Sequence, residues 1–350
     1  MRRFFDMRNF GVPFLAAVLA TALVGCGSFG GAAGGGKFLS EPVVVGLGGD
    51  WELNGLLSVP TSARPEKPVP AVVLVQGSGP SDMNSTVGGN KPFLDIAGYL
   101  AANGIASIRY DKRTFVHGAR MVAELGGDMT VRQETIEDAI LAAEILRADP
   151  RIDGSRIYLV GLSLGGMLAP RIHAEGGNFS GLILLAGSPR LLTDILIEQL
   201  TSLVDLTLEN GPEKNAQLAQ LSAMASLFTS IPAMTDAVAK ITPAFGAYAY
   251  YYKDLITHPF ESFVPSVQVP ILVMQGSRDY QVLADKDFVI LKELFAGHPD
   301  ATFKLYPNLN HLFMPTGATN IDEHAKEMMG TAGKVDRQVL RDLVSWIRSR

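Results

Sequence analysis

The chain reads Ile-Tyr-Leu-Val-Gly-Leu-Ser-Leu-Gly-Gly over residues 157–166. An apolar run of strand length is followed by the pattern Gly-x-Ser-x-Gly and then by an apolar helical segment. In this strand–turn–helix context the serine lies on a sharp, strained turn, where side chains two residues to either side would clash. The turn exposes the Ser163 hydroxyl at a helix N-terminus, where developing negative charge is favoured. The segment therefore predicts that Ser163 is a nucleophile at the end of a buried strand.

Seven further apolar runs are expected to join this strand in one sheet. The first two, at 43–45 and 53–59, predict an opening antiparallel pair. The others lie at 71–75, 105–110, 182–185, 271–274 and 302–306. They are continuous rather than alternating, as expected for parallel strands that are covered on both faces.

Helical patterns separate these strands. One follows Pro92 at 93–102, and a second, at 131–146, follows a capping-box pattern of Thr130 and Gln133. A third, at 334–348, repeats an apolar residue every four positions. The alternation of strands and helices predicts an α/β fold with a mostly parallel, eight-stranded sheet covered by helices.

Residues 191–263 interrupt this alternation. They contain no convincing strand, and the stretch is too long for an ordinary connection. We expect an inserted all-helical cap at about 190–264. Its aromatic end predicts an acyl or aryl substrate pocket made by Phe245, Tyr248, Tyr251 and Tyr252. The alternative is that these rings pack the cap onto the core.

A serine nucleophile needs a base, and the base needs an orienting acid. Asp279 follows the strand at 271–274, and His311 follows the strand at 302–306. The carboxyl ends of parallel strands meet at one edge of the sheet, so both side chains are expected near Ser163. We therefore predict a catalytic triad of Ser163, Asp279 and His311.

Other titratable residues fit these roles less well. His298 precedes the last strand and is expected at the opposite edge of the sheet, and His173 lies about 15 Å along the helix after Ser163. Asp285 and Asp287 lie where a helix is expected to start. Three further histidines lack the context of a strand end, namely His117, His258 and His324.

An oxyanion hole needs two backbone N–H groups. Leu164, the residue after the nucleophile, is expected to supply one. The other is expected from the loop after the strand at 71–75, with Ser78 as the first choice and Gly77 as the second. The glycines of this loop let the backbone approach a substrate closely.

Four motifs together resemble the α/β-hydrolase superfamily over residues 43–350, in a branch of bacterial serine carboxylesterases. They are Gly77-Ser78-Gly79-Pro80, Asn90-Lys91-Pro92-Phe93, Arg109-Tyr110-Asp111-Lys112-Arg113-Thr114 and Gly161-Leu162-Ser163-Leu164-Gly165-Gly166. This branch is similar to dienelactone-hydrolase-type and acyl-peptidase-type enzymes. The resemblance implies hydrolysis of short to medium acyl or aryl esters by the predicted triad, with no cofactor and no metal.

Two departures from the family pattern stand out. Gln76 occupies the usual histidine position of the oxyanion loop, and the nucleophile is serine rather than the cysteine of dienelactone hydrolases proper. Asp111, Lys112 and Arg113 are interpreted as an ion-paired loop beside the site. Two alternatives remain: a peptidase or thioesterase with the same triad, and a catalytically idle, lipid-anchored envelope protein that keeps the fold.

The N-terminus explains the single cysteine. Basic residues precede an apolar stretch at 10–24, and Leu23-Val24-Gly25-Cys26 resembles the lipobox of bacterial lipoproteins. The resemblance implies a signal peptide at 1–25, a lipidated Gly-rich tether at 26–40 and a hydrolase domain at 41–350. Lipidation of Cys26 would anchor the protein to a membrane of the cell envelope. Residue 27 is glycine rather than aspartate, which favours the outer membrane in a Gram-negative cell.

Composition excludes other classes of protein. One cysteine cannot close an intramolecular disulfide, and a hydrophobic content of 47% excludes disorder over most of the chain. The formal net charge of −5 argues against nucleic acid as a partner. The expected partners are a small-molecule ester and, through the lipid anchor, a membrane. No feature of the sequence predicts an oligomeric state.

Overall fold

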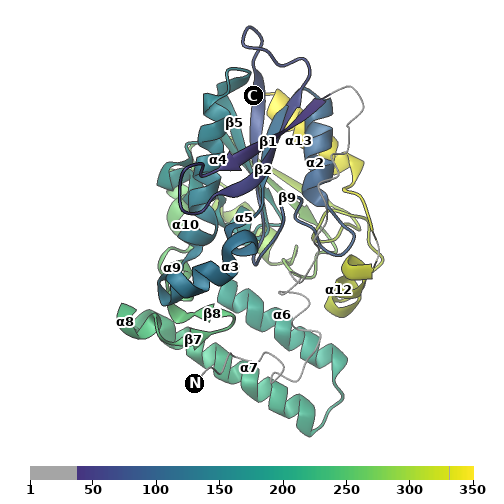
Figure 1. Ribbon diagram of the computed structural model, residues 1–350. Coiled ribbons are helices and arrows are strands. Elements are labelled where there is room, and N and C mark those ends of the chain that lie inside the picture. Colours follow the sequence, from purple (N-terminus) through teal and green to yellow (C-terminus); the bar gives the residue numbers. More distant parts are fainter. Residues whose placement is uncertain (1–37, 331) are drawn as a thin grey trace.

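Eight strands form one sheet in the order β1-β2-β4-β3-β5-β6-β9-β10, in a computed structural model that describes residues 38–330 and 332–350 (Figure 1). The strands are β1 (Phe38–Val45), β2 (Leu53–Pro60), β3 (Val69–Val75), β4 (Ala106–Tyr110), β5 (Ile152–Leu162), β6 (Gly181–Leu185), β9 (Ile271–Gly276) and β10 (Ala301–Tyr306). β2 pairs antiparallel with β1 and with β4, and the other neighbouring pairs are parallel. The predicted mostly parallel, eight-stranded sheet is confirmed.

β5 starts at Ile152, well before the predicted run at 157–160, and the other large difference from a predicted strand boundary is at β1. This strand starts at Phe38 and not at residue 43, so it includes residues 38–40 of the predicted tether. Phe38 pairs with Pro60 at the far end of β2. Backbone pairing with β2 keeps these residues in the strand even though they are exposed and partly polar. An apolar sequence pattern does not reveal such residues.

Helices cover both faces of the sheet. They are α2 (Pro92–Ala102), α3 (Arg113–Glu124), α4 (Glu137–Ala148), α5 (Leu164–Ile172), α6 (Leu192–Thr207), α7 (Pro212–Ser230), α8 (Asp236–Ala239), α9 (Ala249–Thr257), α10 (Phe260–Phe263), α11 (Asp287–Leu294), α12 (Ile321–Gly330) and α13 (Arg337–Arg348). Short 3-10 or π turns occur at η2 (Gly126–Asp128), η3 (Arg132–Ile136), η4 (His173–Gly177), η5 (Ile231–Ala233) and η6 (Val264–Ser266).

β3 lies between the two halves of the hydrophobic core, and all seven of its residues are buried. Val72 and Leu74 belong to the apolar cluster that includes residues of α2 and α13. Val73 and Val75 belong to the cluster that includes residues of α4 and α5. A strand buried on both faces has no polar side to show, which explains its uninterrupted apolar sequence.

The predicted helices form, with corrected starts. Gln133 Oε1 accepts a hydrogen bond of 2.9 Å from Thr130 N, but the chain passes through the π turn η3 before α4 begins. α13 starts at Arg337 instead of residue 334, because the Asp336 side chain caps it by accepting from Gln338 N at 2.7 Å. α3 was not predicted; it buries only two of its twelve residues, and its apolar residues Phe115, Val116 and Val122 are exposed.

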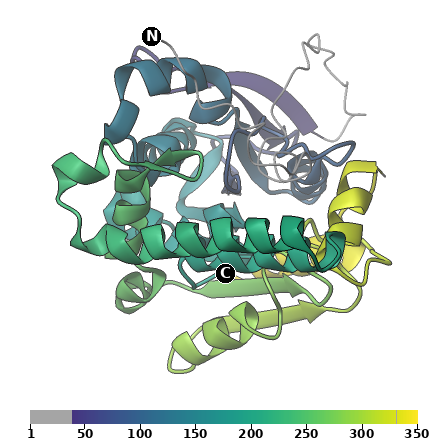
Figure 2. The same cartoon turned by 90° about the horizontal axis from the view of Figure 1, so that it is seen from below.

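An insertion between β6 and β9 contains α6 to α10. Figure 2 views the molecule from this side and shows α6 and α7 running side by side. The expectation that the insertion is wholly helical needs one correction. Strands β7 (Pro243–Ala244) and β8 (Ala247–Tyr248) form a tight hairpin, whose turn uses Gly246 at a φ of 75°. Within the described residues, no helix is both long enough and apolar enough to cross a membrane.

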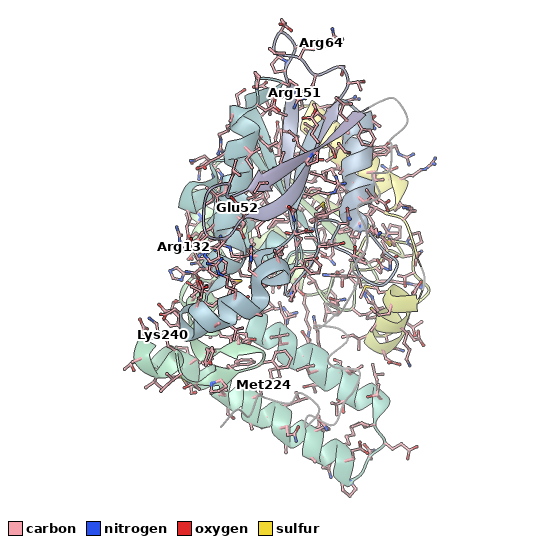
Figure 3. The ribbon with its side chains drawn as sticks, in the orientation of Figure 1. Glu52, Arg64, Arg132, Arg151, Met224 and Lys240 are labelled. Carbon is pink, nitrogen blue, oxygen red and sulfur yellow. The ribbon has the colours of Figure 1, made fainter. Side chains whose placement is uncertain are left out.

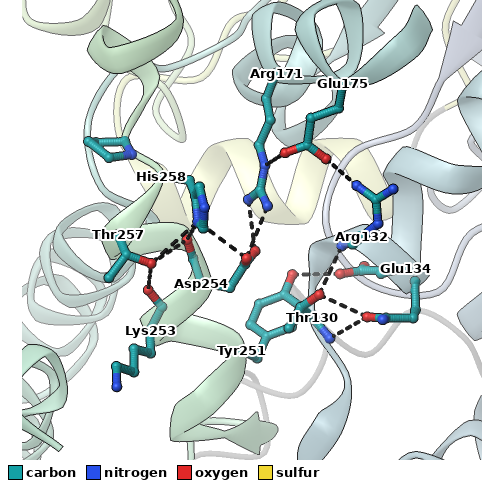
Figure 4. A network of polar contacts seen from close by, with 12 residues as sticks. Thr130, Arg132, Glu134, Arg171, Glu175, Tyr251, Lys253, Asp254, Thr257 and His258 are labelled. Atoms are coloured by element: carbon teal, nitrogen blue, oxygen red, sulfur yellow. Dashed lines mark hydrogen bonds and ion pairs between the residues drawn. The ribbon is translucent and has the colours of Figure 1, made fainter. Parts of the chain in front are cut away.

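Ion pairs attach the insertion to the sheet domain. Arg171 of α5 donates two hydrogen bonds to the Asp254 carboxylate of α9, at 2.8 and 3.0 Å (Figure 4). Lys240, which is labelled in Figure 3, forms an ion pair of 2.5 Å with Asp128 of η2. The Arg171 guanidinium is almost fully buried. Its two-pronged contact therefore fixes the direction of α9 as well as its distance from the sheet.

The turn at the end of β5 makes a prediction about stability. A Cβ at Gly161 would lie 2.2 Å from Gly165 O, so Gly161→Ala should lower the free energy of unfolding by about 3 kcal/mol. Gly154→Ala in the same strand is the matched control, since a Cβ there meets nothing within 4 Å. Urea unfolding of both variants measures the difference. Equal stability of the two variants would contradict the close contact.

Candidate active site

Ser163 lies on a strained turn between β5 and α5. Its φ of 55° and ψ of −117° are unusual for a residue with a side chain and raise the energy of the fold by about 1–3 kcal/mol. The turn is tight because backbone atoms pack where side chains are absent. A Cβ at Gly165 would lie 2.3 Å from Val75 O, and one at Gly161 would meet Gly165 O. The structure thus has no room for a side chain at Gly161 or at Gly165, as predicted.

Asp279 and His311 form a buried pair. His311 Nδ1 lies 2.7 Å from Asp279 Oδ2, and the two residues are 5% and 3% exposed. Gln275 donates to the same carboxylate oxygen at 3.0 Å, while Gln281 N and Val282 N donate to Oδ1 at 2.8 and 3.0 Å. Four contacts therefore fix the carboxylate that orients the imidazole. With Nδ1 on the carboxylate, Nε2 is the ring nitrogen left for proton transfer.

The pKa of Asp279 is lowered in the folded protein. Burial alone would raise this pKa, but the positive charge of His311 and the hydrogen bond from it outweigh burial. The carboxylate consequently stays ionised. An ionised Asp279 stabilises the imidazolium that forms when His311 takes a proton.

A small cavity lies directly beside Ser163. Its volume is about 40 Å³, room for about three water molecules. The lining residues come from the oxyanion loop, the start of α5, the start of the insertion and the loop after Asp279, and are Ser78, Ser163, Leu164, Met167, Ser188, Leu192, Ile195, Leu196, Gln199, Gln281 and Val282. The cavity thus brings together Ser163, the two first-choice oxyanion residues and the segment that holds Asp279.

The oxyanion loop packs against the nucleophile. A Cβ at Gly77 would lie 3.1 Å from Ser163 Cβ, so the Gly77 backbone approaches the serine closely. Ser78 N–H donates to no other group in the described part of the chain. Leu164 is the first residue of α5, where N–H groups have no partner within the helix. These are the two N–H groups that sequence reasoning proposed for an oxyanion hole.

Comparison with known proteins extends this picture. The family model of the prolyl oligopeptidase family matches residues 125–329, a span that includes Ser163, Asp279 and His311. The chain belongs to the prolyl oligopeptidase family. Its α/β-hydrolase fold, inferred above from four motifs, is confirmed.

Individual relatives are esterases by name. Esterase EstD of Thermotoga maritima is 35% identical over 299 residues, which are 85% of this chain and 66% of EstD, so the chain spans slightly under two thirds of that relative. Est1E of Butyrivibrio proteoclasticus superposes with a TM-score of 0.54 at 14% identity, covering 88% of this chain and 99% of Est1E. An esterase of Pyrococcus furiosus gives a TM-score of 0.53 at 12% identity, over 89% and 91% of the two chains. Both solved structures share the fold of this chain.

The predicted aromatic pocket is not found in this member of the prolyl oligopeptidase family. None of Phe245, Tyr248, Tyr251 and Tyr252 lines the described cavity beside Ser163. Tyr252 donates its hydroxyl to Phe245 O at 2.6 Å, and Tyr251 donates its hydroxyl to Glu134 at 2.5 Å. Both tyrosines are buried in the core cluster. Tyr251 thus attaches α9 to Glu134 of the sheet domain, in line with the alternative interpretation, and aliphatic side chains of α6 line the cavity instead.

Among the competing histidines, His298 and His173 have hydrogen-bond partners, whereas neither ring nitrogen of His324 has one among the described residues. His298 Nε2 lies 3.0 Å from Val267 O, and His173 Nδ1 accepts from Phe179 N at 3.1 Å. His324 is buried with its ring against Tyr280, and burial lowers its pKa. Within the described residues, no three His, Cys, Asp or Glu side chains are grouped to hold a metal.

Asp287 does more than begin a helix. It is fully buried, and its two carboxylate oxygens accept from the Arg190 guanidinium at 2.8 and 2.9 Å. Ser188 also donates its hydroxyl to Asp287 and lines the cavity. The ion pair joins α11 to the segment that leads into the insertion. It therefore sets the position of Ser188 at the cavity.

The segment after β4 is ion-paired, as the sequence interpretation proposed. Arg113 pairs with Asp138, and Lys112 Nζ pairs with Glu134 at 2.6 Å. Asp111 Oδ1 accepts from the backbone of Met83 at 2.8 Å.

Sequence reasoning missed two further contacts at the site. Lys112 Nζ also donates to Gly77 O in the oxyanion loop, at 2.7 Å. Gln275 donates to Asp279. The sequence signal that could have pointed to Lys112 and Gln275 is a polar residue within a buried strand or directly after one. Gln76 follows the same pattern and donates its side chain to Tyr110 O, which gives the open position of the family motif a structural role.

The lowered pKa of Asp279 predicts how acid affects stability. Stabilisation by the ionised carboxylate is complete above the ordinary aspartate pKa of about 3.9 and is lost as pH falls through the lower pKa of the folded protein. The free energy of unfolding of the wild type should therefore exceed that of Asp279→Asn most near neutral pH. The gap should narrow below about pH 4. Urea unfolding across this range measures it, and a gap independent of pH would contradict the lowered pKa.

Proposed function

We propose that the protein is a serine esterase that hydrolyses small carboxylic esters through an acyl-enzyme on Ser163. The observation that carries this proposal is the buried Asp279–His311 pair, which lies on loops at the same sheet edge as a serine on a strained turn. The family and the esterase relative EstD support it. The triad assignment combines this geometry with the chemistry of serine hydrolases.

Acylation begins at Ser163. His311 Nε2 accepts the hydroxyl proton as Ser163 Oγ forms a bond to the ester carbonyl carbon. The carbonyl π electrons move to oxygen, and the N–H groups of Ser78 and Leu164 stabilise the resulting oxyanion. Asp279 holds the imidazolium. When the tetrahedral intermediate collapses, the alkoxide leaves with the proton from His311.

Deacylation uses the same groups. Water takes the place of the alcohol and gives one proton to His311 as its oxygen attacks the acyl carbon. Collapse of the second tetrahedral intermediate breaks the bond to Ser163 Oγ, which regains the proton from His311. The carboxylic acid is released, and the enzyme returns to its starting state with no cofactor in the balance.

The cavity supports small, uncharged substrate groups. A volume of about 40 Å³ suits a short acyl chain better than a long one. Leu192, Ile195 and Leu196 offer aliphatic surface, and the lining contains no charged side chain among the described residues. A peptidase is the second candidate, because the chain belongs to the prolyl oligopeptidase family. Thioesters would enter the same chemistry.

The triad is tested with p-nitrophenyl esters of increasing acyl length. Ser163→Ala and His311→Ala should each lower kcat by at least about 10⁴-fold without unfolding the protein. His298→Ala is the matched control and should keep most activity, because His298 bonds a distant backbone carbonyl. Acetyl and butyryl esters should be cleaved faster than long-chain esters and faster than amino-acid p-nitroanilides.

Two results would contradict this proposal. Retained turnover in Ser163→Ala would place the nucleophile elsewhere. A wild-type protein that hydrolyses no ester and is not labelled at Ser163 by a fluorophosphonate probe would support the idle envelope protein. Faster cleavage of p-nitroanilides than of esters would favour the peptidase.

The cellular location is a separate proposal. Cys26 and the preceding apolar stretch lie outside the described residues, and the proposal depends on their sequence alone. Lipidation of Cys26 would hold the enzyme at a membrane on the periplasmic side of the cell envelope. Multiple acyl chains are needed for stable anchoring, since one chain binds only weakly.

Replacing Cys26 tests the anchor. Cys26→Ser should move the protein from the membrane fraction to the soluble fraction, or leave an unprocessed precursor. Esterase activity of the purified Cys26→Ser protein should match that of the wild type, which serves as the folding control. An unchanged distribution and unchanged processing would contradict the lipobox interpretation.

A further inference from the structure

The oxyanion loop is tied to the end of β4 and to the segment after it at three points. Gln76 donates its side-chain amide to Tyr110 O, and Lys112 N donates to Ser81 O at 3.0 Å. Between these two contacts, Lys112 Nζ donates to Gly77 O at 2.7 Å. The Lys112 side chain is 1% exposed, although a lysine is rarely buried without a specific partner. This contact puts the ammonium group on the carbonyl of the same peptide group that carries the Ser78 N–H.

The geometry of a trans peptide gives that contact a consequence. No cis peptide bond occurs among the described residues, so the Gly77 carbonyl and the Ser78 N–H point in opposite directions. An ammonium on the carbonyl holds the whole peptide plane. The N–H then points away from Lys112, and Ser78 and Ser163 both line the cavity. A cation on the carbonyl also polarises the amide and strengthens its N–H as a donor.

Lys112 is in turn linked to the insertion through Glu134. Its second partner is Glu134 Oε1 at 2.6 Å, and Glu134 Oε2 accepts from the Tyr251 hydroxyl at 2.5 Å. Figure 4 shows Tyr251 of α9 directed at Glu134. Glu134 is 4% exposed and Tyr251 is 7% exposed, so water screens this chain of contacts weakly. It runs from a helix of the insertion through a carboxylate and an ammonium to the oxyanion loop.

We propose that Lys112 is a positioning residue that aims the Ser78 N–H at the oxyanion, and that Glu134 and Tyr251 hold Lys112 in place. The proposal rests on the esterase mechanism above. An oxyanion donor acts mainly on the transition state, so its misdirection lowers kcat more than it changes KM. If the buried ion pair had only a structural role, its removal would lower the stability of the protein without lowering kcat selectively.

The same segment offers a matched control. Arg113 is the next residue, is also buried, and pairs with Asp138 and Glu137. Its side chain makes no contact with the oxyanion loop in the described structure. Arg113→Met therefore removes a comparable buried cation from the neighbouring position and leaves the Gly77 carbonyl contact intact.

The experiment compares four variants of the full-length protein with p-nitrophenyl butyrate. Lys112→Met should lower kcat by about 10²-fold and change KM by less than about threefold. The double variant Lys112→Met/Glu134→Gln removes both charges and so avoids an unpaired buried carboxylate. It should regain stability in urea unfolding and keep the loss of kcat. Tyr251→Phe should lower kcat by about fivefold, and Arg113→Met should lower stability but not kcat.

A boronic acid gives a second readout. Butylboronic acid forms a tetrahedral adduct with an active-site serine and places an oxygen in the oxyanion hole. Its inhibition constant should rise in Lys112→Met and in the double variant by about the factor that kcat falls. Arg113→Met should leave this constant unchanged, because the oxyanion donor keeps its direction.

Three outcomes would overturn the positioning role. They are a kcat in Lys112→Met within about threefold of the wild type, recovery of kcat in the double variant, or an equal loss of kcat in Arg113→Met. In each case the wild type still hydrolyses the ester, so the proposed function stands while this inference fails. A wild type without esterase activity would instead remove the proposed function, and the positioning role with it.

Discussion

Backbone contact at the carboxyl edge of the sheet is the constraint on which the site depends. The end of β3, the end of β5 and the start of α5 approach closely enough that a single Cβ at Gly161 or Gly165 would overlap a backbone atom. This packing forces the residue between them, Ser163, to a positive φ. It also leaves Gly77 in contact with the serine. The nucleophile and the proposed oxyanion donors therefore have fixed relative positions before any substrate binds.

Much of the fold was predictable because burial leaves a strong pattern. Strands covered on both faces must be apolar throughout, and apolar runs located every strand of the sheet, although β1 and β10 are partly exposed. The Asp279–His311 pairing followed from one rule, namely that side chains at the carboxyl ends of parallel strands gather at one edge. α3 escaped prediction because it covers little of the core.

Other errors had a different physical origin. The tyrosines of α9 were assigned to a pocket because an aromatic-rich segment has the same composition whether it lines a cavity or packs a helix on a core. Only the partners of Tyr251 and Tyr252 distinguish the two cases. The role of Lys112 was also not predictable, since its partners Gly77 and Glu134 lie 35 and 22 residues away in the chain. No local pattern reports such distances.

The Arg190–Asp287 ion pair has a consequence for exchanging the insertion. Asp287 is fully buried and belongs to the sheet domain, whereas Arg190 lies at the entrance to the inserted helices. A chimera that grafts a relative's helices after residue 189 would leave this carboxylate without its guanidinium, at a cost of about 3–5 kcal/mol. Modular replacement should therefore join the two sequences beyond Arg190, so that the graft boundary follows the charge pairing rather than the secondary structure.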